Sequence, residues 1–345
     1  MKILGIESSC DETAAAIVED GANILSNVVV SQIDIHSEYG GVIPEIAARS
    51  HIEAIQPVIN KAFKDANLAI DDIDAIAVTH TPGLVGSLLV GTLAARTLAV
   101  VHNKPFYPTH HLKSHIYANW LSGYQPEFPL LAAVISGGHT QIIYMERHDH
   151  FEIIGTTRDD AIGECFDKVA KILGLPYPGG PSVANVAKNG NPDKYHLPIP
   201  HVDGLDFSFS GIKTAVLRAV QKELNLPITT PSHELKDHLS AEQIADFAAS
   251  FQKTAVDILL KKLQTATETR KVKSILLAGG VSANQALRDE LQKRFAKDYQ
   301  VFYPAPQFST DNGAMVASAA YYSIQAGDPY SDPYQLDISP RSTIY

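Results

Sequence analysis

Apolar runs of strand length alternate with longer stretches of helical periodicity through the first hundred residues. The two earliest runs flank a tight polar turn at residues 7–12, which predicts a strand, a polar turn and a returning strand. A later stretch places its apolar residues on one helical stripe that Pro57 is expected to interrupt. The alternation is typical of an α/β domain. The elements predicted here are strands at 2–6, 13–18, 23–31 and 74–78, and helices at 44–66 and 84–101.

The same arrangement starts again near residue 129. An apolar run is followed by the turn Gly137-Gly138-His139-Thr140 and a second run, as at the N-terminus. We interpret this as a duplication of two α/β lobes. Residues 190–239 are rich in proline and are expected to form loops around a short helix. The further predicted elements are strands at 129–136, 141–145, 274–278 and 300–303, and helices at 111–121, 161–173, 180–189, 211–222, 240–266, 282–295 and 311–326, with an extended tail after residue 327.

Composition narrows the class of protein. The 345 residues suit one large or two medium domains, and 45% hydrophobic with 19% charged residues is ordinary for a soluble globular enzyme. The first apolar run begins at residue 2 without a basic leader, so a signal peptide is not expected. Polar residues break the apolar stretch at 84–101, which argues against a membrane span. Two cysteines, Cys10 and Cys165, are expected to be free thiols in the cytoplasm.

Charge is spread unevenly along the chain. Residues 1–100 carry 5 Lys and Arg against 13 Asp and Glu, and residues 306–345 carry 1 against 4. The middle of the chain is almost neutral, with 22 against 21, and the whole chain has a net charge of −10. An acidic chain binds polyanions poorly by itself. Any nucleic acid should therefore lie on the middle of the chain or be held partly by other subunits.

Two histidines, His111 and His115, are four residues apart in a predicted helix. Side chains at this spacing project from the same face, so both imidazoles can reach one divalent metal. Asp311 opens a later predicted helix, where it is expected either to cap that helix or to supply a third ligand. Two histidines and one carboxylate suit Fe(II), with Zn(II) as the alternative.

Three glycine turns adjoin predicted strands or helices: Ser136-Gly137-Gly138, Pro178-Gly179-Gly180-Pro181 and Ala278-Gly279-Gly280. Glycine lets a backbone approach a phosphate or a base closely, and helix N-termini add oriented N–H donors. Together the turns indicate a ligand of nucleotide size. No Walker A and no GxGxxG pattern occurs, which argues against P-loop and dinucleotide sites.

Motifs along most of the chain resemble one family. They are GIESSCDETAAAIV, YGGVIPEIAARSHIEAI, TPGLVGSLLVG, HHLKSHIYA, ISGGHTQ, FDKVAKILGLPYPGGP, DFSFSGIKTA, LAGGVSANQALR and STDNGAM. In this order, from residue 2 to about 320, they resemble the bacterial tRNA threonylcarbamoyladenosine transferases, formerly called O-sialoglycoprotein endopeptidases.

The resemblance implies a two-lobed α/β fold of the actin, sugar-kinase and Hsp70 superfamily (ASKHA), built from two duplicated ribonuclease H-like domains. We expect a first lobe of residues 1–108 and 324–345, and a second lobe of 109–323 with the nucleotide loops and an interlobe metal site. The implied activity is transfer of threonylcarbamoyl from threonylcarbamoyl-AMP to the exocyclic amino group of the adenosine 3′ of the anticodon, in tRNAs that read codons beginning with A.

The family's site residues carry over by motif. His111, His115 and Asp311 match its metal ligands. Asp11 and Glu12 lie in the first loop, where they are expected either to act in catalysis or to order the loop, and His139 either assists proton removal or makes a structural hydrogen bond. Ala184 cannot make the ribose contact that a polar residue makes there in some relatives. The positions that match the adenylate contacts are Val134, Ile135, Ser136, Gly137, Gly138, Asp167, Gly180 and Asn284.

The resemblance also implies partners. These are tRNA, a dimerising paralogue of the same fold and a small P-loop ATPase, with no membrane. The acidic first lobe is expected to bind protein through the helices at 44–66 and 84–101. The second lobe is expected to face tRNA with its basic segments at 212–222, 261–273 and 288–297.

Two other enzyme classes remain as alternatives. A metallopeptidase of the HExxH type would place Glu after the first histidine, where this chain has Leu112. An ATP-hydrolysing enzyme of the ASKHA superfamily would also need nucleotide loops. A metal held by two imidazoles is unusual for Mg-ATP chemistry, which prefers oxygen ligands.

Overall fold

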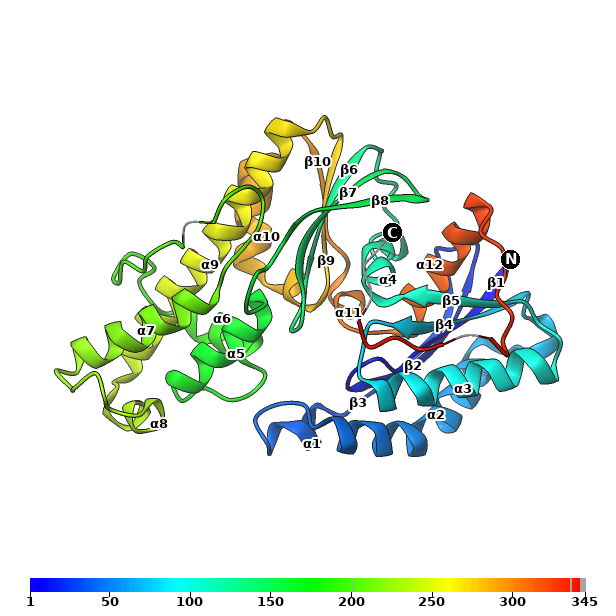
Figure 1. Cartoon of the computed structure of the whole chain (residues 1–345), viewed down its shortest axis with the longest axis horizontal. Coiled ribbons are helices and arrows are strands. Elements are labelled where there is room, and N and C mark those ends of the chain that lie inside the picture. The colour runs from blue at the N-terminus through cyan, green and yellow to red at the C-terminus, as the bar shows by residue number, and fades with distance from the viewer. Residues whose placement is uncertain (201, 336, 342–345) are drawn as a thin grey trace. The chain divides into compact units, whose positions relative to one another are not determined.

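The computed structural model describes residues 1–200, 202–335 and 337–341 and divides the chain into two compact units (Figure 1). The first unit comprises Met1–Pro126, Met145–Glu152 and Phe302–Tyr345, and the second comprises Glu127–Tyr144 and Ile153–Val301. The acidic segments 1–100 and 306–345 therefore both belong to the first unit.

A five-stranded sheet with the order β3-β2-β1-β4-β5 forms the centre of the first unit. Its first three strands are antiparallel neighbours, and β4 and β5 continue parallel to β1. The strands are β1 (Lys2–Glu7), β2 (Glu12–Glu19), β3 (Asn23–Ser31), β4 (Ala75–Thr81) and β5 (Phe106–His110).

Helices cover both faces of this sheet, which explains why β1, β2 and β4 are apolar on both sides. On one face α2 (Pro44–Ala66) and α3 (Val85–Val101) lie side by side and bury residues such as Val58 and Ala95 against the strands (Figure 1). On the other face α12 (Gly313–Ala326) packs on β1 and β2. The unit also contains α1 (Ile33–Ser37), η1 (Ile70–Asp72), α4 (His111–Tyr117), η2 (Trp120–Ser122) and α11 (Pro306–Ser309).

The second sheet has the order β10-β9-β6-β7-β8, in which β6 and β9 are parallel. Read from β8, its chain order of strands repeats that of the first sheet, which supports the predicted duplication. Its strands are β6 (Leu130–Ile135), β7 (Thr140–Arg147), β8 (His150–Thr156), β9 (Ser274–Ala278) and β10 (Gln300–Phe302). The helices that follow are α5 (Ile162–Ile172), α6 (Gly179–Ala187), α7 (Ser210–Glu223), α8 (Ser232–Leu235), η3 (Lys236–His238), α9 (Ala241–Thr269), η4 (Gly280–Ala283) and α10 (Gln285–Phe295).

Most predicted elements are confirmed, and the differences are local. The expected interruption at Pro57 is wrong, because α2 continues from Pro44 to Ala66 with Pro57 inside the helix. The helix expected to reach residue 121 ends at Tyr117 and is followed by the short turn η2. Short elements at β5, β8 and α1 were not predicted, because five to seven residues carry too little periodicity.

Residues 109–126, 145–152 and 302–323 belong to the first unit, whereas the sequence-based expectation placed them in the second lobe. The first and last of these segments do so because α4 follows directly from β5 and α12 packs against β1 and β2. The expected range 324–345 includes residue 336 and residues 342–345, which lie outside the described residues. Within the described part of the chain, no helix is both long enough and apolar enough to cross a membrane.

Candidate functional site

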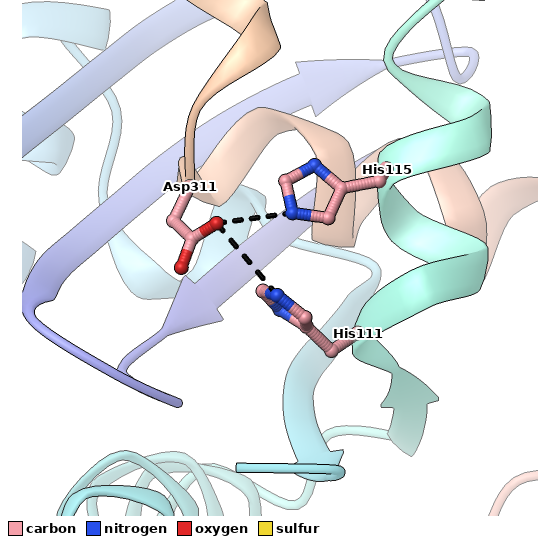
Figure 2. Close-up of side chains that lie close together, drawn as sticks. All are labelled: His111, His115 and Asp311. Carbon is pink, nitrogen blue, oxygen red and sulfur yellow. Dashed lines mark ion pairs between the residues drawn. The ribbon is translucent and has the colours of Figure 1, made fainter. Parts of the chain in front are cut away.

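The side chains of His111, His115 and Asp311 converge in the first unit (Figure 2). His115 Nε2 lies 3.0 Å from Asp311 Oδ1, and His111 Nε2 lies 3.7 Å from the same oxygen. The two imidazole rings meet edge to face, with centroids 4.6 Å apart. One ligand atom from each residue lies within 4.8 Å of the other two. All three residues belong to the first unit.

Local sequence explains how the two histidines are presented. The parallel strand β5 ends at His110, whose Nδ1 accepts a hydrogen bond from the backbone N–H of Leu112 and caps α4. His111 and His115 then lie one turn apart on the same face of this helix, as their spacing predicts.

Asp311 reaches the pair because α12 begins very close to the sheet. A Cβ on Gly313 would lie 2.5 Å from the backbone nitrogen of Ala16, so only glycine fits there. Asn312, not Asp311, caps this helix by accepting a hydrogen bond from the N–H of Met315. The capping role considered for Asp311 is thus wrong, and its carboxylate remains directed at the histidines (Figure 2).

Glu7 is a buried carboxylate next to His111. Its Oε1 accepts a hydrogen bond from Ser9 N at 2.6 Å, and its Oε2 accepts one from Thr79 Oγ1 at 2.6 Å. The same Oε2 lies 3.2 Å from His111 Nδ1, and Ser9 Oγ lies 3.1 Å from that nitrogen. His111 thus faces carboxylates with both ring nitrogens, Glu7 with Nδ1 and Asp311 with Nε2.

The charges in this cluster shift pKa values strongly. Burial lowers the pKa of His111, but the carboxylates of Asp311 and Glu7 outweigh burial and raise it to about 9. Burial raises the pKa of Glu7, yet the charge of His111 and the hydrogen bonds from His111 and Thr79 lower it overall. Each of these two groups therefore favours the charged form of the other.

His115 provides the observation that tests whether a cation fits here. Its side chain is 1% exposed, and among the described residues neither ring nitrogen makes a hydrogen bond, although Nε2 lies 3.0 Å from Asp311 Oδ1. A buried imidazole nitrogen without a partner is costly unless something binds it. Two imidazoles and one carboxylate form a usual donor set for Zn(II) or Fe(II). The residues present therefore fit a divalent transition metal.

Asp11 lies in the loop between β1 and β2 and Glu12 begins β2, and both are partly buried. Burial, and then the charges of Asp311 and Asp11, raise the pKa of Glu12 well above its ordinary value. His51 of α2 anchors this loop, since its Nε2 lies 3.0 Å from the carbonyl oxygen of Cys10 and its Nδ1 lies 2.8 Å from Thr13 Oγ1. The loop thus lies within electrostatic reach of Asp311.

In the second unit the turns at Gly137 and Gly279 meet at the C-terminal end of β6, and the turn at Gly179 lies against Asp167 of α5. Gly163 packs against Ser136 O, Gly179 against Asp167, and Gly279 against Ile135 O, with no room for a Cβ at any of the three. Gly137, Gly138, Gly180 and Gly280 instead face open space, where a Cβ would meet no atom within 4 Å. Exposed glycine backbone of this kind is suited to a closely approaching ligand.

The other predicted adenylate residues occupy different positions around these turns. Val134 and Ile135 are fully buried at the end of β6, directly before the turn that contains Gly137 and Gly138. Asp167 Oδ1 accepts a hydrogen bond from Gly179 N at 2.6 Å, and burial raises the pKa of its carboxyl group. Asn284 caps α10 through Oδ1 and donates from Nδ2 to Gln252. Ser136 Oγ accepts from the N–H of His139.

Sequence reasoning missed Glu7, Ser9, Thr79 and His51. The sequence did offer a signal for Glu7, namely an acidic residue at the end of an apolar strand. Such a residue is rarely buried without a partner, so its position indicates a paired carboxylate. Thr79 and His51 had none, since their partners lie 72 and 38 residues away in the chain.

Comparisons with solved structures show the fold. T. kodakarensis HypF matches with a TM-score of 0.62 at 13% identity, over 94% of this chain and 48% of that one. The activator of the 2-hydroxyisocaproyl-CoA dehydratase from Clostridium difficile matches with a TM-score of 0.53 at 12% identity, over 94% of this chain and 96% of that one. These likenesses confirm the predicted two-lobed ASKHA fold class.

Sequence comparisons extend over nearly the whole chain. A tRNA N6-adenosine threonylcarbamoyltransferase of Symbiobacterium thermophilum is 51% identical, over 94% of this chain and 92% of that protein. One of Caldicellulosiruptor bescii is 49% identical, over 95% of this chain and 94% of that protein. The family model described as tRNA N6-adenosine threonylcarbamoyltransferase matches residues 23–318. The chain therefore belongs to the tRNA N6-adenosine threonylcarbamoyltransferase family.

Proposed function

We propose that this chain transfers threonylcarbamoyl from threonylcarbamoyl-AMP to N6 of the adenosine 3′ of the anticodon, in tRNAs that read codons beginning with A. The observation that carries the proposal is the coexistence of a His-His-Asp donor set and exposed glycine turns in a chain about half identical to transferases of this name. We expect the reaction to take place in the cytoplasm.

The chemistry sets what the protein must supply. The adenosine N6 attacks the carbonyl carbon of the mixed anhydride, the bond from that carbon to the phosphate oxygen breaks, and AMP leaves. N6 gives up one proton to a base. AMP is already a good leaving group, so binding and orienting both substrates can provide much of the acceleration.

The second unit contributes the binding of the donor. Gly137, Gly138 and Gly180 leave backbone accessible for the phosphate and the base, and the partly buried Asp167 supplies a polar side chain beside them. Val134, Ile135, Ser136 and Asn284 adjoin these turns and complete the adenylate contacts that the family motifs imply. This map follows the family motifs and the open space at the glycines.

The first unit contributes the donor set for a metal. His111, His115 and Asp311 would hold one divalent ion, for which Fe(II) is our first expectation and Zn(II) the second. Such an ion supplies Lewis acidity, which polarises a carbonyl group. Asp11 and Glu12 flank the point where His51 anchors the chain between β1 and β2, and we assign them a role in catalysis or in ordering the loop.

The first unit also carries a surface that suits a protein partner. Val85, Leu89 and Leu93 follow one another at four-residue spacing on α3, and each is 43–52% exposed. Ile52 on the neighbouring α2 is 65% exposed. Rows of exposed apolar side chains on paired helices are typical of helix–helix interfaces. We assign this surface to a paralogue of the same fold, with a small P-loop ATPase as a further partner of the complex.

Mass spectrometry of nucleosides tests the activity. Purified chain with its partner proteins, threonylcarbamoyl-AMP and a tRNA that reads a codon beginning with A should form threonylcarbamoyladenosine. The same tRNA with guanosine in place of the target adenosine should stay unmodified. Unmodified tRNA in the first reaction would contradict the proposal, and phosphate release from ATP by the chain alone would favour the ATP-hydrolysing alternative.

A further inference from the structure

Glu7 is a completely buried carboxylate beside the histidines, and both of its oxygens accept hydrogen bonds. It ends β1, and β4 runs parallel beside it, which places Thr79 against its Oε2. That oxygen is also the one that faces His111 Nδ1 at 3.2 Å. The carboxylate is thus fixed from two sides and presents one oxygen to the imidazole.

We infer that Glu7 is a positioning residue that holds His111 with its proton on Nδ1, so that Nε2 is free to bind the metal. The inference rests on the proposed metal site. A carboxylate can only accept a hydrogen bond, and the ring nitrogen that faces it must therefore carry hydrogen. In a neutral imidazole the other nitrogen then has the free lone pair, and here that nitrogen faces Asp311. Carboxylates in this arrangement orient metal-binding histidines and raise their basicity.

The two histidines of the site are not equivalent in this respect. Nδ1 of His115 is buried and makes no hydrogen bond within the described structure. The carboxylate near this ring is Asp311, which faces Nε2 at 3.0 Å, so the described structure places no acceptor on Nδ1 that would free Nε2 for a metal. His111 is the ligand that the fold orients in advance, and the contribution of Glu7 to metal affinity must act through His111.

Glu7→Gln tests this role sharply because of the neighbouring backbone. Ser9 N needs an acceptor, which keeps the amide oxygen of the new side chain at the position of Oε1. The amide NH2 group is then directed at His111 Nδ1, where it can only donate. The substitution preserves shape but favours the proton of His111 on Nε2, the nitrogen required for the metal.

The experiment measures the affinity of the metal-free chain for Zn²⁺ by competition with a chelator. We expect Glu7→Gln to raise the dissociation constant roughly 10- to 100-fold. Thr79→Val, which keeps the carboxylate but removes one hydrogen bond to it, should give a smaller increase. Glu19→Gln is the matched control, since Glu19 lies at the far end of the neighbouring strand β2 and should leave the affinity unchanged.

Different failures have different meanings. If the wild-type chain and all variants bind no Zn²⁺, the metal site itself is wrong. If the wild type binds and Glu7→Gln binds equally well, the role of Glu7 is overturned while the metal site stands. Thermal denaturation of the metal-free variants separates loss of affinity from loss of folding.

A measurement on the wild type tests which ring nitrogen of His111 carries the proton, even if Glu7→Gln does not fold. Long-range ¹H–¹⁵N correlation spectra of the Zn²⁺-loaded chain, with ¹⁵N-labelled histidine, report which ring nitrogen carries the proton. We expect Nδ1–H with Nε2 bound to zinc at His111. A proton on Nε2 of His111 would overturn the proposal.

Discussion

His51 Nε2 lies 3.0 Å from the carbonyl oxygen of Cys10 and ties α2 to the acidic loop between β1 and β2. A carbonyl only accepts, so Nε2 donates, and Nδ1 then accepts from the hydroxyl of Thr13 at 2.8 Å. Burial lowers the pKa of His51, which agrees with a neutral ring. One histidine therefore holds the loop at two points.

His51→Ala should remove the acceptor of the Thr13 hydroxyl and one of two hydrogen bonds to the Cys10 carbonyl, which keeps the one from Ser87 Oγ. We expect a loss of about 1–3 kcal/mol in the free energy of unfolding, measured by urea denaturation. Transfer activity should fall as well, because Asp11 and Glu12 lose their anchor. His102→Ala at the exposed end of α3 is the control. A variant with wild-type stability would show that the loop needs no such anchor.

His115→Ala should remove most of the bound metal, because it deletes one of three ligands from a buried site. The measurement is metal content of anaerobically purified protein, where we expect about one ion per wild-type chain and little in the variant. His233→Ala, at an exposed position on α8, should keep the full content. Full metal content in His115→Ala would refute the ligand assignment.

Gly138→Ala should weaken donor binding without disturbing the fold. The added Cβ meets no protein atom within 4 Å, so stability should be unchanged, but it occupies space that a closely bound adenylate needs. We expect at least a roughly tenfold loss, or about 1.4 kcal/mol, in calorimetric binding of a stable adenylate analogue. Gly211→Ala, whose Cβ has ordinary contacts at 3.7 Å, should bind like the wild type. Equal affinity in both variants would make the nucleotide map wrong.

His148 should make the first unit sensitive to acid. Burial lowers its pKa to about 4 against the partial opposition of Asp149, while its ring stacks on Tyr322 and lies near the hydroxyl of Tyr117. A folded-state pKa below the unfolded value near 6.5 means that the unfolded chain binds the proton more tightly. The contribution is thus complete above pH 6.5 and declines as the pH falls toward 4.

The test compares the wild type with His148→Phe, which keeps a ring but cannot take up a proton. Urea denaturation between pH 7 and pH 4.5 should show a smaller loss of stability in the variant. His196→Phe in the second unit is the control and should follow the wild type. Parallel pH profiles of wild type and His148→Phe would contradict the shift.

Charge reversal should separate the surface for tRNA from the surface for protein. Lys261→Glu and Lys271→Glu place negative charge on exposed parts of the second unit and should weaken tRNA binding and flatten its dependence on salt. Leu89→Glu on α3 should instead disrupt the complex with the partner, which gel filtration detects. The reverse pattern would show that the two surfaces are assigned to the wrong partners.

The sequence by itself determined much of this protein, because its main signals are local. Apolar periodicity predicts α2, α3 and most strands, the spacing of His111 and His115 predicts their shared face, and the ordered motifs identify the family. Such signals depend on neighbouring residues and need no knowledge of distant contacts.

Only the tertiary structure decided what depends on distant packing. Gly313 lets α12 pack closely against β2, and this packing places Asp311 beside His115, although the two residues are almost two hundred positions apart in the sequence. Both residues belong to the first unit. The role inferred for Glu7 depends on its contacts with Thr79 and His111, and no local sequence pattern predicts these contacts. Contacts between remote residues follow from which faces are buried together, and that is settled by the fold as a whole.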